Sequence, residues 1–527
     1  MTTVRDATFD LLRKHGLTTI FGNPGSNELP FLSGMPADFR YVLGLHEGAV
    51  LGMADGYAQA LGCPALVSLH AAAGTGNALG VLTNSVYSHS PLILLAGQQV
   101  RSTVGQQTML SIVEPESLVR PLAKWSYQPA CAQDVPRSIS QAIHLATLPP
   151  KGPVFLAVPY DDWAVEASDQ TEHLLRRTSA AGGCLSEVQL AEIVGALDAA
   201  VNPVLVLGPE VDAEVANGQA QRLAEALQVP VWQTPSMSRL SFPTRHPSFR
   251  GALPASVRGV TEALAGHDVI LVVGGPVFRY HQYEPGEYLA PDVLLLHVTS
   301  DPDEAARAPM GQAYVGDIRD TLDRLAGAVG PTSRPALEPP AEFVAPSRAD
   351  GAVHPSALFA ELRSLAPDDT VWVKESTSTT ADFWSQMDIS LPGSYFFPAA
   401  GGLGFGLPAA VGAQLARPDR PVVGIIGDGS ANYGITALWT AAQYHIPVII
   451  VILKNGTYGA LRWFSGVLEA GEVPGMDVPG IDFALIAQGY GVDATSVSTV
   501  AGFAKAFTAA LASDRPTVIE VDTAFTL

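Results

Sequence analysis

Short apolar runs rich in β-branched residues recur along the chain, and each ends in a glycine or a polar residue before a helix-length segment. This rhythm is typical of strands in parallel sheets whose two faces are covered by helices. The pattern predicts strands in three series: Thr18–Phe21, Tyr41–Leu45, Ala65–Leu69 and Leu92–Leu95; then Pro203–Leu207, Val229–Trp232, Val269–Val273 and Val293–Val298; then Val371–Val373, Val422–Ile426, Val448–Leu453 and Thr517–Val521.

Two loop-like stretches separate the three series. The first lies near residues 178–183, and the second is the Pro-, Ala- and Ser-rich segment 331–346. A chain of 527 residues is too long for a single core when a domain averages about 150 residues. We therefore predict an α/β protein of three doubly wound domains with mostly parallel sheets, at residues 1–181, 182–341 and 342–527.

The composition narrows the possible partners. A formal net charge of -21 repels phosphate backbones and anionic lipids, so we predict neither a nucleic-acid nor a membrane partner. Cys63, Cys131 and Cys184 lie far apart without a CxxC pair, which indicates neither a disulfide framework nor a zinc site. With no apolar leader at the N-terminus, these features predict a cytoplasmic protein.

The segment 422–459 carries the strongest chemical signal. It reads as a strand, a Gly-Asp-Gly-Ser turn, a helix after Ser430, a second strand and an Asn-Gly-Thr turn. A parallel crossover brings the carboxyl ends of both strands to one edge of the sheet, so we expect Asp428 and Asn455 to be neighbours. Asp428, the Asn455 amide oxygen and the Thr457 carbonyl offer the oxygen ligands that Mg²⁺ prefers.

Glycines in the same turn suit a phosphate group. Gly427 and Gly429 allow the backbone to approach an anion closely, and the helix after Ser430 points free N–H groups at it. The alternative is a capped helix and an ordinary Asn-Gly turn, but both features on one crossover favour a metal-diphosphate site. Other phosphate motifs are weaker, because no GxxxxGK[ST] sequence occurs and the glycines at 74, 76 and 80 miss the dinucleotide spacing.

Four polar residues follow predicted strands or open a predicted helix. Glu47 begins the helical pattern EGAVLGMADGYAQALG, Ser26 lies in FGNPGSNELP, and His70 and His281 follow strands of different domains. Each has a structural alternative, which is a dipole-stabilising carboxylate, a helix cap or a hydrogen-bonding histidine. The places of His70 and His281 after strand ends, in two different domains, favour a shared cleft.

Several motifs together give a resemblance to a known family. GNPGSNE, LHEGAVLGMADGYA, LHAAAGTGN, FRYHQY, ESTSTT, AAGGLGFGLPAA and GDGSANY, in this order along nearly the whole chain, resemble the thiamine-diphosphate-dependent 2-oxo acid decarboxylases, and among them the benzoylformate decarboxylases. The resemblance implies a pyruvate-decarboxylase-like fold, with a pyrimidine-binding domain first and a diphosphate- and Mg²⁺-binding domain last. One departure is Lys454, which stands where the family has the first Asn of an Asn-Asn pair, so its effect on packing and cofactor affinity is open.

By this resemblance, the cofactor is thiamine diphosphate and its metal is Mg²⁺, with Ca²⁺ or Mn²⁺ able to substitute. Glu47 would share a proton with the aminopyrimidine ring, and Ser26 would orient the substrate carboxylate. His70 would act at the substrate carbonyl oxygen, and His281 would protonate the enamine carbon. The expected reaction is the non-oxidative conversion of benzoylformate to benzaldehyde and CO₂ through a thiamine ylide and an enamine.

The resemblance also implies contact residues and an assembly. Leu403 is expected beneath the bent cofactor, and the full set of expected cofactor contacts is Thr377, Ser378, Gly401, Leu403, Gly427, Asp428, Gly429, Ser430, Tyr433 and Asn455. The apolar residues expected around an aryl group, or alternatively in the ordinary core, are Leu110, Phe397, Leu461 and Phe464. The implied assembly is a homotetramer with sites completed by two subunits, in aromatic catabolism of the mandelate-pathway type.

Other activities stay open at this point. Within the cofactor class, the alternatives are a phenylpyruvate-type decarboxylase and an acetolactate-synthase-like carboligase. Outside it, the chain could be a non-catalytic relative that serves as a regulatory or binding subunit. The retention of Glu47 and Asp428 argues against the non-catalytic alternative.

Overall fold

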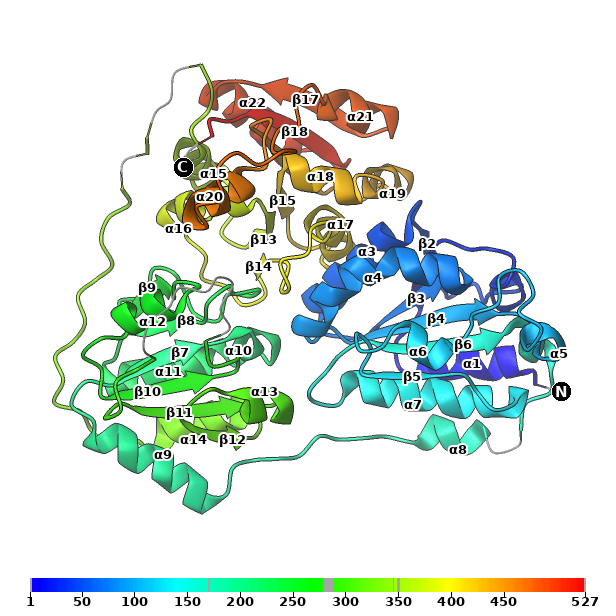
Figure 1. The fold of residues 1–527 in the computed structure, drawn as a ribbon, viewed down its shortest axis with the longest axis horizontal. Coiled ribbons are helices and arrows are strands. Elements are labelled where there is room, and N and C mark those ends of the chain that lie inside the picture. Colours follow the sequence, from blue (N-terminus) through cyan, green and yellow to red (C-terminus); the bar gives the residue numbers. More distant parts are fainter. Residues whose placement is uncertain (1, 169–170, 279–287, 345, 348–350, 526–527) are drawn as a thin grey trace. The chain divides into compact units, whose positions relative to one another are not determined.

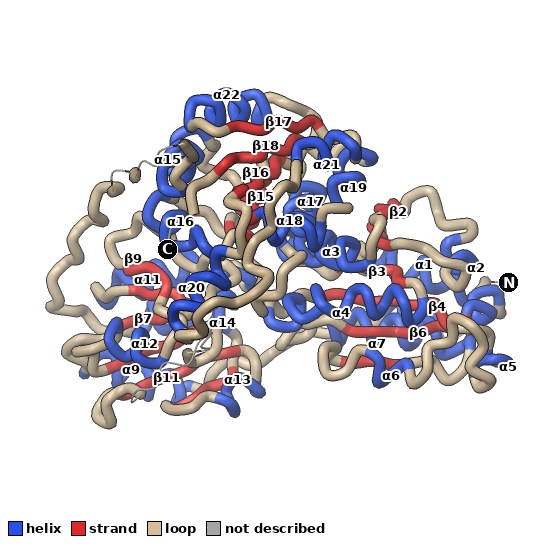
Figure 2. Tube along the Cα trace, turned by 45° about the horizontal axis from the view of Figure 1, so that its top comes forward, coloured by secondary structure: helices blue, strands red, loops and turns tan. Residues whose placement is uncertain are grey.

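The computed structural model describes residues 2–168, 171–278, 288–344, 346–347 and 351–525. It contains three six-stranded sheets with interleaved helices, which Figure 1 shows in chain order and Figure 2 by secondary structure. Every strand predicted from the sequence is present, with ends that differ by a few residues. The predicted α/β fold with parallel sheets is confirmed.

The N-terminal sheet is parallel throughout and has the order β2-β1-β3-β4-β6-β5. In an order of this kind the connections leave the first strand in both directions, so β1 and β3 flank the switch point where α/β proteins bind ligands. The elements are β1 Thr19–Gly22, β2 Arg40–Leu43, β3 Ala65–Leu69, β4 Leu92–Gln98, β5 Trp125–Tyr127 and β6 Val154–Pro159, with helices α1 Val4–Lys14, α2 Leu29–Leu32, α3 Glu47–Leu61, α4 Ala71–Tyr87, α5 Arg101–Val104, α6 Pro115–Leu118, α7 Val135–Thr147, α8 Thr171–Arg176, η1 Ala132–Asp134 and η2 Tyr160–Ala164.

The C-terminal sheet repeats this order as β14-β13-β15-β16-β18-β17, so its switch point lies between β13 and β15. Thr377 follows β13 and Asp428 follows β15, which puts both at that point. The elements are β13 Val371–Glu375, β14 Tyr395–Phe396, β15 Val422–Gly427, β16 Ile449–Lys454, β17 Asp493–Val497 and β18 Thr517–Asp522, with helices α15 Pro355–Leu365, η3 Thr377–Thr379, α16 Thr380–Gln386, α17 Gly406–Ala416, α18 Asp428–Gly434, α19 Ala437–Gln443, α20 Gly459–Val467, α21 Phe483–Gly489 and α22 Val500–Leu511.

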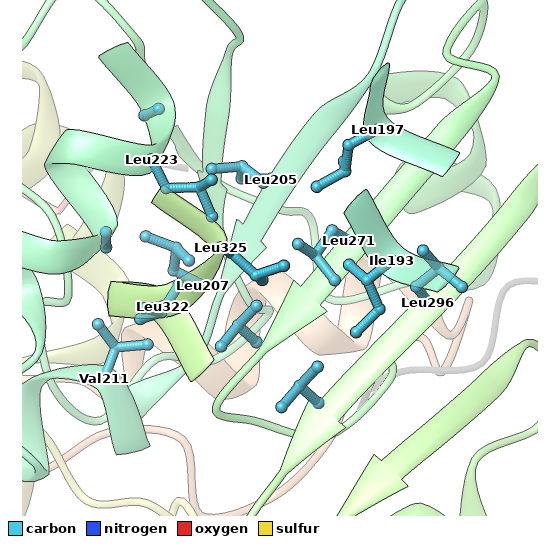
Figure 3. Packing of buried hydrophobic residues seen from close by; sticks show 14 of the residues in the cluster. Ile193, Leu197, Leu205, Leu207, Val211, Leu223, Leu271, Leu296, Leu322 and Leu325 are labelled. Carbon is cyan, nitrogen blue, oxygen red and sulfur yellow. The ribbon is translucent and has the colours of Figure 1, made fainter. Parts of the chain in front are cut away.

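The central sheet has a different order, β12-β11-β10-β7-β8-β9, and it is also parallel. Leucine, isoleucine and valine side chains fill the space between one face of this sheet and its helices (Figure 3). The elements are β7 Val204–Leu207, β8 Val231–Gln233, β9 Phe249–Ala252, β10 Val269–Val273, β11 Leu294–Thr299 and β12 Gln312–Val315, with helices α9 Glu187–Ala199, α10 Pro209–Ala213, α11 Asn217–Leu227, α12 Val257–Ala263, α13 Pro302–Arg307 and α14 Ile318–Ala328.

The chain forms two compact units that do not follow the sequence order. One unit combines residues 1–180, 347–380 and 398–527, and the other combines residues 181–346 and 381–397. Within the first unit, α3 packs against α17. A Cβ at Gly412 would overlap the Met53 carbonyl oxygen, and one at Gly56 would overlap the backbone of Ala409. Glycine at these positions therefore allows the two helices to approach closely.

Among the described residues, every helix is either too short or too polar to cross a lipid bilayer.

Candidate active site

Asp428 opens α18 directly after β15, and its carboxylate binds the turn that follows β16. Oδ2 accepts hydrogen bonds from the backbone N–H of Asn455 (3.0 Å) and of Gly456 (2.7 Å), and Oδ1 accepts one from Gly429 (2.8 Å). The Asn455 Oδ1 atom accepts the backbone N–H of Thr457 at 3.0 Å. The predicted proximity of Asp428 and Asn455 is confirmed, and their ligand roles stay predictions.

The surroundings of Asp428 suit a divalent cation. The residue is only 4% exposed, and burial raises the pKa of its carboxyl although the three backbone N–H donors act in the opposite direction. Among the described residues, no Lys, Arg or His side chain donates a hydrogen bond to it. A buried carboxylate next to the Asn455 turn, with no cationic side chain bonded to it among the described residues, suits Mg²⁺.

The turn after β15 differs in one detail from the sequence prediction. The helix begins at Asp428, with Gly427 as its N-cap, rather than after Ser430, and the Asp428 carboxylate accepts the Gly429 N–H inside the first turn. A Cβ at Gly429 would overlap the ring of Tyr458, so this position requires glycine. Tyr433, on the exposed side of α18, is hydrogen bonded to Tyr458 and is 56% exposed.

Lys454, the departure from the family pattern, is held by a buried carboxylate of the neighbouring strand. Its Nζ donates to Glu520 Oε1 at 2.9 Å, and Glu520 also accepts the Phe483 N–H (2.7 Å) and the Ser496 hydroxyl (3.0 Å). Burial alone would lower the pKa of Lys454, but the hydrogen bond and charge of Glu520 outweigh burial and raise it. The lysine therefore stays charged and bound to β18, while the next residue meets Asp428.

The other expected cofactor contacts of this domain lie on loops beside β13. Thr377 and Ser378 form η3, which Lys374 supports by donating to the Ser376 carbonyl (2.7 Å) and to Thr380 Oγ1 (2.8 Å). The glycine-rich loop before α17 carries Gly401, which is exposed, and Leu403, which is half-buried. These residues are exposed or half-buried and belong to the same compact unit, so a cofactor could contact them.

In the N-terminal domain, Glu47 is the first residue of α3 and is 6% exposed. Its Oε1 accepts the side-chain amide of Asn23 at 3.2 Å, and its Oε2 accepts that of Asn77 at 2.9 Å. A Cβ at Gly74 would approach Glu47 Oε1 to 2.9 Å, so glycine makes room for the carboxylate. Asn23 and Asn77 were not predicted from the sequence, although Asn23 lies in the same turn as Ser26.

His70 is bound to a carboxylate that sequence reasoning missed. His70 Nδ1 lies 2.8 Å from Glu28 Oε2, and Glu28 is 3% exposed. The two Glu28 oxygens also accept the backbone N–H of Gly25 and of Gly97, each at 2.9 Å. Glu28 therefore joins the ends of β1, β3 and β4 at the switch point. A carboxylate on Nδ1 favours a proton on that nitrogen and leaves Nε2 to face a ligand.

Ser26 lies on the exposed side of this same turn, with its hydroxyl 3.4 Å from Asn27 Oδ1. The Asn27 side-chain amide donates to the Leu110 carbonyl at 3.4 Å, so the predicted pocket residue Leu110 lies beside the turn. A Cβ at Gly25 would overlap the imidazole of His70. The structure thus brings Ser26, His70 and Leu110 together.

The remaining predicted residues are distributed as follows. Leu461 and Phe464 lie on α20, where Leu461 is 49% exposed and Phe464 is half-buried. Phe397 belongs to the second compact unit, where its N–H donates to the Ser238 carbonyl at 3.0 Å. His281 lies outside the described residues.

Three stretches of the chain match domains of one enzyme family. Residues 2–116 match "Thiamine pyrophosphate enzyme, N-terminal TPP binding domain", and residues 376–521 match the "C-terminal TPP binding domain" of the same enzymes. Residues 190–325 match their central domain. The chain belongs to the thiamine pyrophosphate enzymes. The first and last domains of this family bind thiamine diphosphate, as their descriptions say.

Individual thiamine pyrophosphate enzymes resemble this chain over their whole length. Benzoylformate decarboxylase of Pseudomonas aeruginosa is 59% identical over 523 residues, which cover 99% of each chain. The structure of a Rhodococcus jostii 4-hydroxybenzoylformate decarboxylase superposes with a TM-score of 0.99 at 62% identity, covering 99% of each chain. That of benzoylformate decarboxylase from Polynucleobacter necessarius gives 0.97 at 34% identity, covering 100% of this chain and 99% of that one.

Proposed function

We propose that this protein is a thiamine-diphosphate-dependent lyase that removes CO₂ from aromatic 2-oxo acids, with benzoylformate as its expected substrate. The main support for the proposal is the 59% sequence identity, over 99% of both chains, to a benzoylformate decarboxylase. The similar Rhodococcus jostii enzyme acts on the 4-hydroxy compound, so ring-hydroxylated acids belong to the same proposed substrate class.

The metal and cofactor have a natural place in the C-terminal domain. Asp428, Asn455 and the Thr457 carbonyl would hold Mg²⁺, or Ca²⁺ or Mn²⁺ in its place, because Asp428 is a buried carboxylate next to the Asn455 turn and no cationic side chain among the described residues is bonded to it. Gly427, Gly429 and Ser430 would face the diphosphate. Thiamine diphosphate, when bound, supplies the electron sink that accepts the electron pair released as CO₂ departs.

Glu47 and His70 would transfer or share protons through the Glu47 carboxyl group and the His70 Nε2 atom. Asn23 and Asn77 each bind one oxygen of Glu47, which fixes the carboxyl group for exchange of a proton with the aminopyrimidine ring. Glu28 holds His70 at Nδ1, so Nε2 is the atom that would meet the substrate carbonyl oxygen. Ser26 would bind the substrate carboxylate, and His281 would deliver the proton that replaces CO₂.

The surroundings of the substrate and the assembly complete the proposal. Leu110, Phe397, Leu461 and Phe464 would contact the aryl ring, and Leu403 would support the cofactor from below. The enzyme would be a cytoplasmic homotetramer in which two subunits complete each site. A place in mandelate-type aromatic catabolism follows from an aryl 2-oxo acid as substrate.

The proposal is tested by CO₂ release from a panel of acids. Purified protein with thiamine diphosphate and Mg²⁺ is supplied in turn with benzoylformate, 4-hydroxybenzoylformate, phenylpyruvate and pyruvate, and the aldehyde products are identified. We expect kcat/KM for the two benzoylformates to exceed that for pyruvate by about 10²-fold or more, because only an aryl group fills an apolar pocket of this kind. The matched blank is the same protein freed of thiamine diphosphate.

Other outcomes identify the alternatives. Preferred turnover of phenylpyruvate would indicate the arylalkyl decarboxylase, and acetolactate formed from pyruvate would indicate the carboligase. Failure to bind thiamine diphosphate at all would revive the non-catalytic relative. Each of these results contradicts the proposed substrate class.

A further inference from the structure

The loop 400–406, which carries Gly401 and Leu403, is held at each of its two ends by a buried side chain of the first compact unit. Asn84, near the C-terminal end of α4, binds residues 400 and 402 at its beginning, and Glu375, the last residue of β13, binds residues 404 and 406 at its end. The two contacts come from segments roughly 290 residues apart in the sequence. Neither residue was predicted as part of a site.

Asn84 is fully buried and uses both ends of its side-chain amide on this loop. Its Oδ1 accepts the backbone N–H of Ala400 at 3.0 Å and of Gly402 at 3.3 Å, and its Nδ2 donates to the Gly402 carbonyl at 2.9 Å. Only an amide of this length can both accept and donate at these positions. Asn84 therefore fixes the orientation of the Gly402 peptide groups as well as their position.

Glu375 is 1% exposed and holds the other end of the loop. Its Oε1 accepts the Gly404 N–H at 2.7 Å, and its Oε2 accepts the Gly406 N–H at the start of α17. Gly404 has a φ of +100°, which only glycine adopts without strain, and a Cβ at Gly406 would overlap that of Glu375. A carboxylate that bridges two N–H groups on either side of Phe405 leaves the backbone little freedom.

Leu403 is the residue between these two attachments, and it remains half-buried while Gly404 to Gly406 are buried. We propose that Asn84 and Glu375 are positioning residues of the cofactor site. Together they fix the position and orientation of Gly401 and Leu403 relative to the thiamine. This inference rests on the proposed function, because that function places the cofactor against the loop. Neither residue touches the reacting atoms, so both act through the loop.

The test uses two variants of nearly unchanged size and a matched control. Asn84→Asp replaces the donor to the Gly402 carbonyl by an oxygen, and Glu375→Gln places an NH₂ group against one of two N–H groups. The control is Gln414→Glu, which makes the same kind of exchange in a buried side chain that bonds the backbone of Arg417, Arg420 and Val422, where β15 begins. That end of the strand is the one away from Asp428.

The first measurement is calorimetric binding of thiamine diphosphate with Mg²⁺ to the full-length apoprotein. We expect Asn84→Asp and Glu375→Gln to raise Kd by about tenfold, as expected for one lost or repulsive buried hydrogen bond, while Gln414→Glu stays within about twofold of the parent. All three variants should melt at lower temperature than the parent. A purely structural role for Asn84 and Glu375 would lower the melting temperature without changing Kd.

The second measurement uses only the parent protein. It therefore gives a result even if the variants do not fold. Hydrogen exchange of the parent, with and without cofactor, should show slow amides at Ala400, Gly402, Gly404 and Gly406 in both states. Fast exchange there without cofactor would overturn the inference, as would parental Kd in both variants. A parent that binds no thiamine diphosphate would overturn the proposed function and this inference together, so the two failures are distinguishable.

Discussion

Glu28 shows how one buried side chain can organise a site built from separate strands. Its carboxylate binds His70 and two backbone N–H groups, one from the turn after β1 and one from the end of β4. The sequence contains Glu28 in the quoted motif GNPGSNE, but its partners His70 and Gly97 lie 42 and 69 residues away. Periodicity alone could not identify such a contact.

Replacement of Glu28 by Gln should impair His70 without impairing cofactor binding. The amide can present only one acceptor oxygen, so either the imidazole or a backbone N–H loses its partner. We expect kcat/KM for the aryl 2-oxo acid to fall roughly 10-fold to 100-fold, with Kd for thiamine diphosphate near the parental value. Steady-state kinetics and calorimetry on the same preparation measure the two quantities.

The control for Glu28→Gln is Glu210→Gln in the central domain. Glu210 is also buried, and its oxygens accept the Thr299 hydroxyl and the Ser300 N–H, each at 2.9 Å. This variant should lose stability while its kcat/KM stays parental. Equal kinetic losses in the two variants would contradict a specific role for Glu28.

Substitution of Asp428 tests directly whether this residue is a ligand of Mg²⁺. Asp428→Ala should abolish Mg²⁺-dependent binding of thiamine diphosphate, because the remaining neutral oxygens cannot hold a hard cation against the diphosphate. Asp428→Asn keeps the size and one acceptor oxygen, and it should weaken binding for the same reason. Titration calorimetry at several Mg²⁺ concentrations measures both, and parental affinity in Asp428→Ala would refute the ligand assignment.

Part of the candidate site could be predicted from the sequence, because polar residues at the ends of predicted strands mark the edge of a sheet where ligands bind. Glu47, Asp428 and Asn455 stand at the ends of apolar runs, so local pattern placed them at sheet edges. The residues that orient them, such as Asn23 and Asn77, are set by tertiary contacts that no spacing reveals. The relation of Phe397 and His281 to the others stays a prediction.

At the scale of elements, most strands predicted from the sequence are interior strands of their sheets, and β2 is the one predicted edge strand among the described residues. The unpredicted strands β5, β9, β12, β14 and β17 lie at sheet edges, and β12 and β17 are largely exposed. An edge strand needs no continuous apolar run, since one side faces solvent. The unpredicted β6 is different, because all of its residues are buried and Val154–Val158 forms an apolar run that could have been recognised.

The end of β13 carries two adjacent buried charges with opposite pH behaviour. Burial raises the pKa of Glu375 to about 7 from 4.5, and burial lowers the pKa of Lys374 to about 7 from 10.5. Between pH 4.5 and pH 7 the unfolded chain has released the Glu375 proton while the folded protein retains it. Folding stability from this group is therefore full below pH 4.5 and is lost as the pH rises to about 7.

We expect the parent to lose about 2 kcal/mol of stability relative to Glu375→Gln between about pH 5 and pH 7. Urea unfolding of the two apoproteins at several pH values measures the difference, and other carboxyl groups cancel in it. Burial lowers the pKa of Lys374 from 10.5 to about 7, so its own contribution to stability changes mainly above pH 7, beyond this window. A difference that does not vary with pH would show that the Glu375 carboxyl is ionised throughout.

At the scale of the whole molecule, the contact between α3 and α17 joins the first and last domains into one compact unit. Gly412→Ala would push a methyl group into the Met53 carbonyl oxygen, which is backbone and cannot turn aside. We expect a loss of about 1–3 kcal/mol in stability, which thermal or denaturant unfolding of the apoprotein would measure.

The matched substitution is Gly195→Ala on α9, where an added Cβ meets nothing within 4 Å. It should raise stability by about 0.5–1 kcal/mol, because alanine loses less backbone entropy than glycine in a helix. The opposite sign of the two changes distinguishes close helix packing from helix propensity. A stabilised Gly412→Ala protein would contradict the close approach of α3 and α17.

The order of synthesis gives the α3–α17 contact a further consequence. Roughly 350 residues separate the two helices, so at about 5–20 residues per second the ribosome needs roughly 20–70 s to deliver α17 after α3. During that time the small-residue face of α3 has no partner from its own chain. We therefore expect the nascent N-terminal domain to expose this face, which is prone to aggregation, until α17 has been synthesised.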